Sequence, residues 1–113
     1  MIEKIVFDYL TGFGLSAPVY TEIPKNPPSK FFVIEKTGGS MENHISSSTL
    51  AIKSYADSLY DAATENEEIK EAMLYGLIES PDIASVELNS DYNFTDTKSK
   101  RYRYHAVFDI VHY

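Results

Sequence analysis

The two longest stretches of alternating polar and apolar residues lie next to each other near the C-terminus, at residues 83–94 and 101–113. Alternation with a period of two predicts β-strands with one apolar face. That face is expected to carry Ala84, Val86, Leu88 and Tyr92 in the first strand, and Tyr102, Tyr104, Ala106, Phe108 and Ile110 in the second. The polar turn at residues 95–100 predicts that the two strands form a hairpin.

A helix is predicted immediately before this hairpin, near Asp57 to Glu79. Its apolar residues recur at helical spacing and form one stripe, made of Leu59, Ala62, Ala63, Ile69, Ala72, Met73, Gly76 and Leu77. The acids Asp61, Glu65, Glu68 and Glu71 are expected mostly on the opposite face. The small residues in the stripe would let the helix lie close to a sheet, and Ser80-Pro81-Asp82 is expected to end it.

The first half of the chain adds one helix and three strands. A short amphipathic helix carries Ile2, Ile5, Val6, Tyr9 and Leu10 and is expected to stop at Gly12 and Gly14. Strands are predicted at residues 18–24, between two prolines, at 31–36 and at 46–55, with Thr37-Gly38-Gly39-Ser40 ending the second and residues 41–45 irregular. The predicted fold is α+β, in the order α-β-β-β-α-β-β, with a single sheet of about five strands. A length of 113 residues fits one domain, covering residues 1–113.

Charge is unevenly distributed along the chain. Seventeen acids and ten bases give a net charge of −7, so general affinity for nucleic acid is not expected. Eight acids and a single base lie between Asp57 and Asp82, whereas four of the ten bases lie at Lys98, Lys100, Arg101 and Arg103. Either group alone is most simply a solvated surface. Together, an acidic face and a basic corner would allow copies of the chain to dock head to tail in a ring.

The sequence contains no arrangement typical of catalysis or metal binding. With no cysteine, thiolate metal sites and cysteine nucleophiles are excluded. His105 and His112 are seven residues apart on one predicted strand, so they lie on opposite faces and about 23 Å apart; His44 has only Glu42 near it. The serines at residues 46–48 lack a nucleophile elbow. We therefore expect no catalytic residues, no metal and no cofactor.

The glycine-containing segments are interpreted as turns. Thr37-Gly38-Gly39-Ser40 lacks the lysine of a phosphate-binding loop and is not clearly followed by a helix. No apolar stretch approaches the roughly 20 residues that span a bilayer, and residues 1–14 lack the core of a signal peptide. We expect no membrane association.

The order of several short motifs resembles a known family. Val19-Tyr20-Thr21-Glu22-Ile23-Pro24 leads through a proline-rich loop to residues 32–39, Phe-Val-Ile-Glu-Lys-Thr-Gly-Gly; residues 50–56, Leu-Ala-Ile-Lys-Ser-Tyr-Ala, then run into the helix with Ala62-Ala63. The hairpin carries Tyr92-Asn93-Phe94-x-Asp96 and Arg101-Tyr102-Arg103-Tyr104. Over nearly its whole length the chain resembles the tail-terminator and head–tail joining proteins of long-tailed bacteriophages and prophages.

This resemblance implies a sheet with two helices packed on one face, and a ring, usually of six subunits, that caps the tail tube and supports attachment of the head. The implied partners are further copies of the chain, the tail tube protein and a head connector or neck protein. The protein would be made in the cytoplasm of a bacterial host and end in the virion, without catalysing a reaction. The expected subunit interface contains Tyr92, Lys98, Lys100, Arg101 and Arg103. Alternatives are a minor capsid or tail-completion protein, or a small-molecule-binding regulatory domain.

Overall fold

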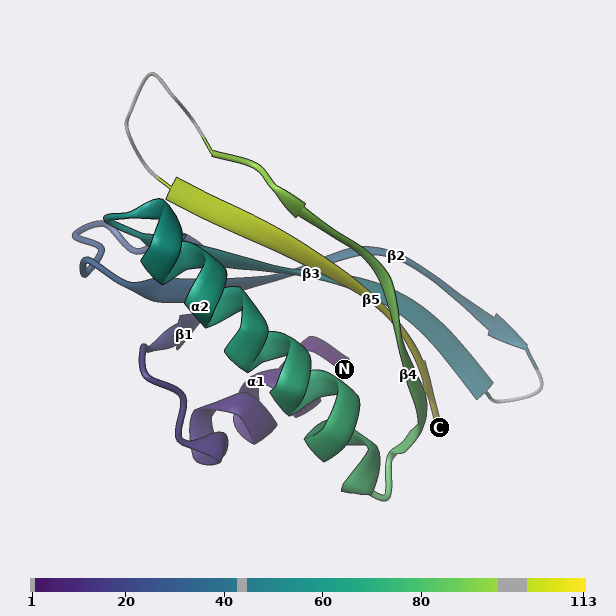
Figure 1. Ribbon diagram of the computed structural model, residues 1–113. Coiled ribbons are helices and arrows are strands. Elements are labelled where there is room, and N and C mark those ends of the chain that lie inside the picture. Colours follow the sequence, from purple (N-terminus) through teal and green to yellow (C-terminus); the bar gives the residue numbers. More distant parts are fainter. Residues whose placement is uncertain (1, 43–44, 96–101) are drawn as a thin grey trace.

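A computed structural model describes residues 2–42, 45–95 and 102–113. The two alternating C-terminal segments form the antiparallel strands β4 (Ile83–Asn93) and β5 (Tyr102–His112), as predicted. They belong to a five-stranded sheet in the order β1-β2-β3-β5-β4, in which β3 and β5 are interior strands (Figure 1). The α+β class, the order of elements and the single sheet are confirmed.

The strands of the first half differ in length from the prediction. Strand β1 is only Val19–Tyr20, because it pairs in parallel with β2 at Phe32 and Val33 and then leaves the sheet. Strand β2 spans Phe31–Glu42, so the segment Thr37 to Ser40 does not end it. Pairing with β3 (Ile45–Ala56) resumes after a register shift between Lys36 and Gly38. A β-bulge of this kind takes up one residue without ending the strand.

The helices cover one face of the sheet, as the resemblance implied. Helix α1 spans Ile2–Phe13 and helix α2 spans Leu59–Glu71. Helix α2 continues through a π-helical turn, η1 (Ala72–Gly76), and a 3-10 turn, η2 (Leu77–Glu79). We call α2, η1 and η2 together the second helical segment. Ser58 begins α2, since its hydroxyl accepts a hydrogen bond from the Asp61 amide at 3.1 Å. Both helices lie on the same side of the sheet (Figure 1).

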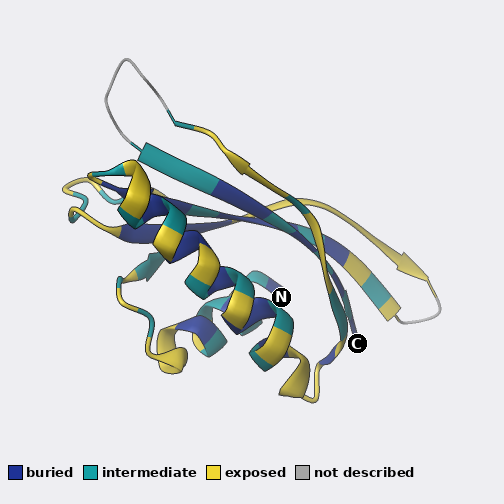
Figure 2. Cartoon of the chain, viewed as in Figure 1, coloured by how far each residue is buried: buried dark blue, intermediate teal, exposed yellow. Residues whose placement is uncertain are grey.

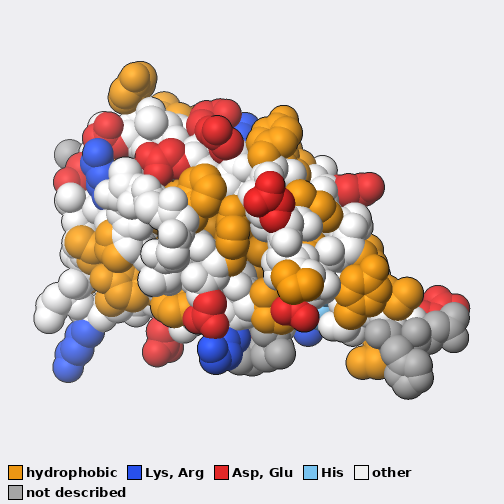
Figure 3. Space-filling model, turned by 90° about the horizontal axis from the view of Figure 1, so that it is seen from below, with side chains coloured by type: hydrophobic (Ala, Val, Ile, Leu, Met, Phe, Trp, Pro, Cys, Tyr) orange, Lys and Arg blue, Asp and Glu red, His pale blue; other side chains and the backbone are white. Residues whose placement is uncertain are grey.

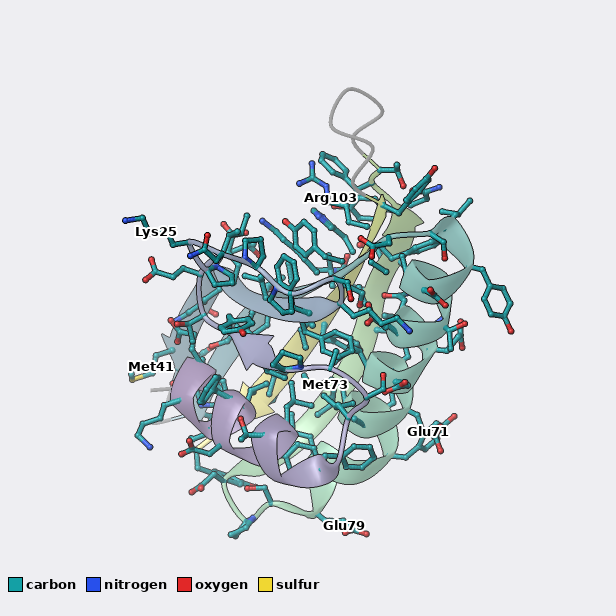
Figure 4. The ribbon with its side chains drawn as sticks, turned by 90° about the vertical axis from the view of Figure 1, so that its left-hand side faces the viewer. Lys25, Met41, Glu71, Met73, Glu79 and Arg103 are labelled. Atoms are coloured by element: carbon teal, nitrogen blue, oxygen red, sulfur yellow. The ribbon has the colours of Figure 1, made fainter. Side chains whose placement is uncertain are left out.

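The hydrophobic core lies between these two layers (Figure 2). It combines buried residues from α1, from the second helical segment and from every strand except β1. These residues are Ile2, Val6, Leu10, Phe32, Ile34, Leu50, Ile52, Ile69, Ala72, Met73, Leu77, Ile83, Ala106, Phe108 and Ile110. Ala106, Phe108 and Ile110, from the predicted apolar face of β5, are therefore on the side that meets the helices. Met73 points from η1 into this layer (Figure 4).

Ala62, Ile69, Ala72, Met73 and Leu77 of the predicted stripe are buried, but the first two turns of α2 differ from the prediction in part. Leu59 is 42% exposed, and the buried positions of the helix are Ala62, Glu65, Asn66 and Ile69. Glu65 was expected on the acidic outer face but is only 2% exposed. The reason is geometric: position 65 lies three residues after Ala62 and four before Ile69, so it falls on the same helical face as both.

Two register shifts in β4 change which side chains share a face. They occur between Ile83 and Ser85 and between Leu88 and Ser90. Each one moves the following residues to the other face of the sheet. Leu88 is opposite Phe108 on the helix side, whereas Tyr92 is opposite His105 on the other side. The prediction that Tyr92 shares a face with Val86 and Leu88 was wrong.

Gly76 lies where α1 approaches the second helical segment, rather than against the sheet. A Cβ atom added there would overlap the Tyr9 hydroxyl and lie 2.9 Å from Cζ of the Tyr9 ring. Tyr9 is held in place by a hydrogen bond of 3.3 Å that its hydroxyl donates to the Ala72 carbonyl. The small residue thus permits contact between the helices.

We predict that Gly76→Ala lowers the free energy of unfolding by about 1–3 kcal/mol, because the new methyl group overpacks the contact with Tyr9. Urea denaturation checks this. The matched control is Gly38→Ala, where the added Cβ would have no atom within 4 Å. Equal stability of the Gly76→Ala variant and the wild type would show that α1 does not pack against Gly76 in this way.

Candidate subunit interface

The sheet face opposite the helices carries a row of aromatic rings on β1, β2 and β3, which the Arg103 guanidinium on β5 connects to Phe94 just after β4. Tyr20 of β1 meets Phe31 of β2 edge-on, with centroids 6.1 Å apart, and Phe31 stacks on Tyr55 of β3 at 4.6 Å. These three residues and Val33 form a second, smaller apolar cluster. Strand pairing produces the row, because Phe31, Tyr55 and Arg103 are direct neighbours on successive strands.

Arg103 continues this row onto β5 and joins it to the end of β4. Its guanidinium lies 4.6 Å from the ring centroid of Phe94 and 5.9 Å from that of Tyr55. Its Nε donates a hydrogen bond of 2.6 Å to the Phe94 carbonyl, and Nη1 donates one of 3.4 Å to the Tyr55 hydroxyl. No Asp or Glu of the described residues forms an ion pair with Arg103. The cation is held by aromatic rings, and no acidic side chain of the described residues balances its charge.

His105 is buried beneath the aromatic residues at the end of β4. Phe94 stacks on its ring at 4.6 Å, and the Tyr92 ring lies 5.3 Å away. The Tyr92 hydroxyl is 3.3 Å from Nδ1. Burial, together with the positive charges of Lys53 and Arg103, lowers the pKa of His105 to about 4. The imidazole is therefore neutral near pH 7 and acts as a packed ring on this face.

Two of the five residues expected at the interface can be located, and the structure brings them into one cluster. Tyr92 and Arg103 both contact Phe94, and we call the three residues Tyr92, Phe94 and Arg103 the Arg103 corner. Lys98, Lys100 and Arg101 lie outside the described residues. The sequence-based interface set omitted Phe94 and His105. Their signal was the alternation Tyr92-x-Phe94 and Arg103-x-His105, which places each pair on one face of its strand.

The acidic residues of α2 divide between solvent and core. Glu67 and Glu71 are exposed, and Figure 4 shows Glu71 pointing away from the domain. Glu68 accepts hydrogen bonds from the amide and hydroxyl of Ser16, at 3.1 and 2.7 Å. Glu65, by contrast, is buried, and neither of its carboxyl oxygens has a hydrogen-bond partner in the described part of the chain. Burial raises the pKa of Glu65 to about 8.

A serine–histidine pair lies at the other end of the sheet. The Ser48 hydroxyl is 2.9 Å from Nε2 of His112, and both residues are buried. Acyl transfer also needs free N–H donors to stabilise an oxyanion. Ser48 lies inside β3, which pairs with β2 on one side and β5 on the other, so the surrounding amides belong to the sheet. The hydrogen bond satisfies two buried polar groups at the edge of the core.

Within residues 2–42, 45–95 and 102–113, no group of three His, Asp or Glu side chains is arranged to hold a metal ion. In the same residues, no helix is both long and apolar enough to cross a membrane. His44, the third histidine of the chain, falls outside these ranges.

Comparisons with known proteins reveal a likeness of fold but no match of sequence. No protein-family model matches the sequence, and no curated protein matches it. Among solved structures, the chain is similar to a chain in the virion of a native gene transfer agent particle, with a TM-score of 0.64. The alignment covers 83% of this chain and 77% of that chain, at 14% sequence identity. At this identity the likeness shows a shared fold.

We predict that Glu65→Gln makes the protein more stable than the wild type above neutral pH. In the unfolded chain Glu65 loses its proton near pH 4.5, whereas in the folded chain it keeps it up to about pH 8. Between these values the unfolded state is favoured as pH rises, so wild-type stability falls by at most about 1.4 kcal/mol per pH unit. Below pH 4 this contribution is constant.

The measurement is the free energy of unfolding of wild type and variant at several pH values from 4 to 9. The difference should grow in favour of Glu65→Gln as pH rises. Glu71→Gln, at an exposed position of the same helix, is the matched control and should show no such trend. A difference between wild type and Glu65→Gln that is independent of pH would contradict the buried carboxyl.

Proposed function

We propose that this chain is a structural protein of a phage-type virion, and that it forms a ring as a tail terminator or head–tail joining component. The observation that carries the proposal is the shared fold with a chain of the gene transfer agent virion, over most of both chains. The motif order along the sequence, which resembles tail-terminator and head–tail joining proteins, agrees with it independently.

The surface of the domain supports a role in assembly. Several large apolar side chains are well exposed, including Tyr60 and Tyr75 on the second helical segment and Met41 near the end of β2. Seen from the helix side, hydrophobic side chains lie among acidic ones (Figure 3). Tyrosine and arginine are enriched at protein interfaces, and the Arg103 corner supplies both. Two unlike surfaces on one chain favour heterologous contacts, which close into a ring when the rotation permits.

The proposed partners are further copies of the chain, a tail tube protein and a head connector or neck protein. The proposed role requires no catalysis and no cofactor. A net charge of −7 is compatible with a ring through which DNA passes, because like charge reduces adhesion to the phosphate backbone. The protein would accumulate in the host cytoplasm and then remain in the finished particle.

We predict that deleting the gene in the bacterium that produces the particles abolishes complete particles, while heads and tails still form separately. A tail tube without its terminator lacks the cap that stops subunit addition, so tails of uncontrolled length are expected. Electron microscopy of lysates measures both effects. Mass spectrometry of purified wild-type particles should detect the chain.

The form of the defect separates the related roles. Tails of normal length beside empty or leaking heads would indicate a minor capsid or neck role in place of a terminator. Complete particles at wild-type yield, with the chain absent from purified virions, would refute a structural role. Expression of the gene from a plasmid should restore complete particles and serves as the control for effects on neighbouring genes.

A further inference from the structure

A groove runs between the second helical segment and strand β4, with a volume of about 420 Å³. Its apolar part consists of Leu74, Tyr75 and Leu88, and the Tyr75 side chain is 76% exposed. Glu67 and Glu71, one turn apart on α2, line it with carboxylates. We call this set of residues, together with Lys70, the α2–β4 groove.

The charge of the α2–β4 groove is negative, because its one cation is already neutralised. Nζ of Lys70 is 2.7 Å from Asp91 Oδ2 and 2.7 Å from Glu67 Oε1. Asp91 also accepts a hydrogen bond of 2.6 Å from the Asn66 side chain, which fixes β4 against α2. Glu71 forms no ion pair with any described residue. The groove therefore offers an exposed aromatic ring beside a carboxylate that has no ion-pair partner among the described residues.

The Arg103 corner has the complementary character. Its guanidinium lacks a carboxylate partner among the described residues, and its two aromatic neighbours, Tyr92 and Phe94, are both exposed. Arg103 and Glu71 lie well apart within one chain (Figure 4), so they do not satisfy each other there. An arginine resting on aromatic rings presents a planar set of donors that suits a carboxylate beside another ring.

We propose that the α2–β4 groove receives the Arg103 corner of a second copy of this chain. The inference rests on the proposed ring-forming role and identifies its contact. Opposite charge favours the pairing and sets its register, while Tyr75, Leu88 and the incoming aromatic side chains supply the buried apolar area. The two surfaces are different, so the contact is heterologous and repeats from subunit to subunit.

Disulfide trapping tests the contact, because the chain has no cysteine of its own. Ile78→Cys places a thiol one turn after Tyr75, and Thr95→Cys places one next to Phe94, so neither removes the proposed contact. Oxidising a mixture of the two variants should give a covalent dimer, whereas each variant alone should remain largely monomeric. Thr11→Cys on the exposed side of α1, mixed with Thr95→Cys, is the control for random collision.

Charge reversal then tests the pairing itself. Adding Glu71→Arg to the Ile78→Cys chain, or Arg103→Glu to the Thr95→Cys chain, should lower the dimer yield about tenfold or more. Mixing the two reversed chains should restore it, since the charges attract again. Glu22→Arg, at an exposed position outside the groove, makes the same change in net charge as Glu71→Arg and should leave the dimer yield unchanged. Circular dichroism verifies that every variant is folded.

A dimer yield no higher than that of the Thr11 control, with folded proteins at the highest soluble concentration, would overturn the proposed contact. So would reversed chains whose mixture fails to recover. If either result is found together with defective particles after gene deletion, the proposed virion role stands and only the proposed contact is refuted. Trapping and recovery combined with normal particles after deletion would support the contact and refute the virion role.

Discussion

The packing of Ile69, Met73 and Leu77 in one core with Leu50, Phe108 and Ile110 is the interaction on which the domain depends. It joins the second helical segment to the interior strands β3 and β5, and α1 adds Val6 and Leu10 to the same core. All of this burial lies on one side of the sheet. The other side receives no helix, so its residues are covered only by one another or face solvent.

The uncovered face is stabilised by cross-strand pairs. Phe31 and Tyr55 stack and are buried, and Lys53 forms an ion pair of 2.8 Å with Glu35 nearby. The row ends at the Arg103 corner, where the rings are half exposed and the cation lacks a counterion among the described residues. A guanidinium group that contacts only aromatic rings and neutral oxygen atoms can still bind a carboxylate. This corner combines tyrosine, phenylalanine and arginine, which are residue types enriched at protein interfaces.

Glu65 illustrates how an interior can contain a residue that a surface pattern would assign to solvent. The helix turns by about 100° per residue, so position 65 faces the sheet whatever its side chain. The raised pKa of Glu65 means that the group is mainly a neutral acid when the domain is folded at pH 7. No described residue offers the carboxyl oxygens of Glu65 a hydrogen bond that would stabilise a negative charge. Protonation therefore avoids the free-energy cost of burying a charged carboxylate.

Local patterns in the sequence were sufficient for the class of fold. Alternation at residues 83–94 and 101–113 predicted the hairpin, and helical spacing around Met73 predicted the covering layer, since both patterns depend only on neighbours along the chain. The glycines at 38 and 39 were misread as the end of a strand. Pairing with β3 carries β2 across them, and long-range pairing is not visible in a single segment.

The residues of the candidate interface were likewise predictable from the sequence only in part. The sequence by itself determined that Tyr92 and Arg103 belong to a charged, aromatic hairpin, and that an acidic helix precedes it. Only the tertiary structure decided that the bulges of β4 turn Tyr92 toward His105, that Glu65 faces the core, and that Tyr75 and Leu88 line one groove. Side chains far apart in sequence meet through strand register and helix rotation, and a shift of one residue in either moves a side chain to the opposite face.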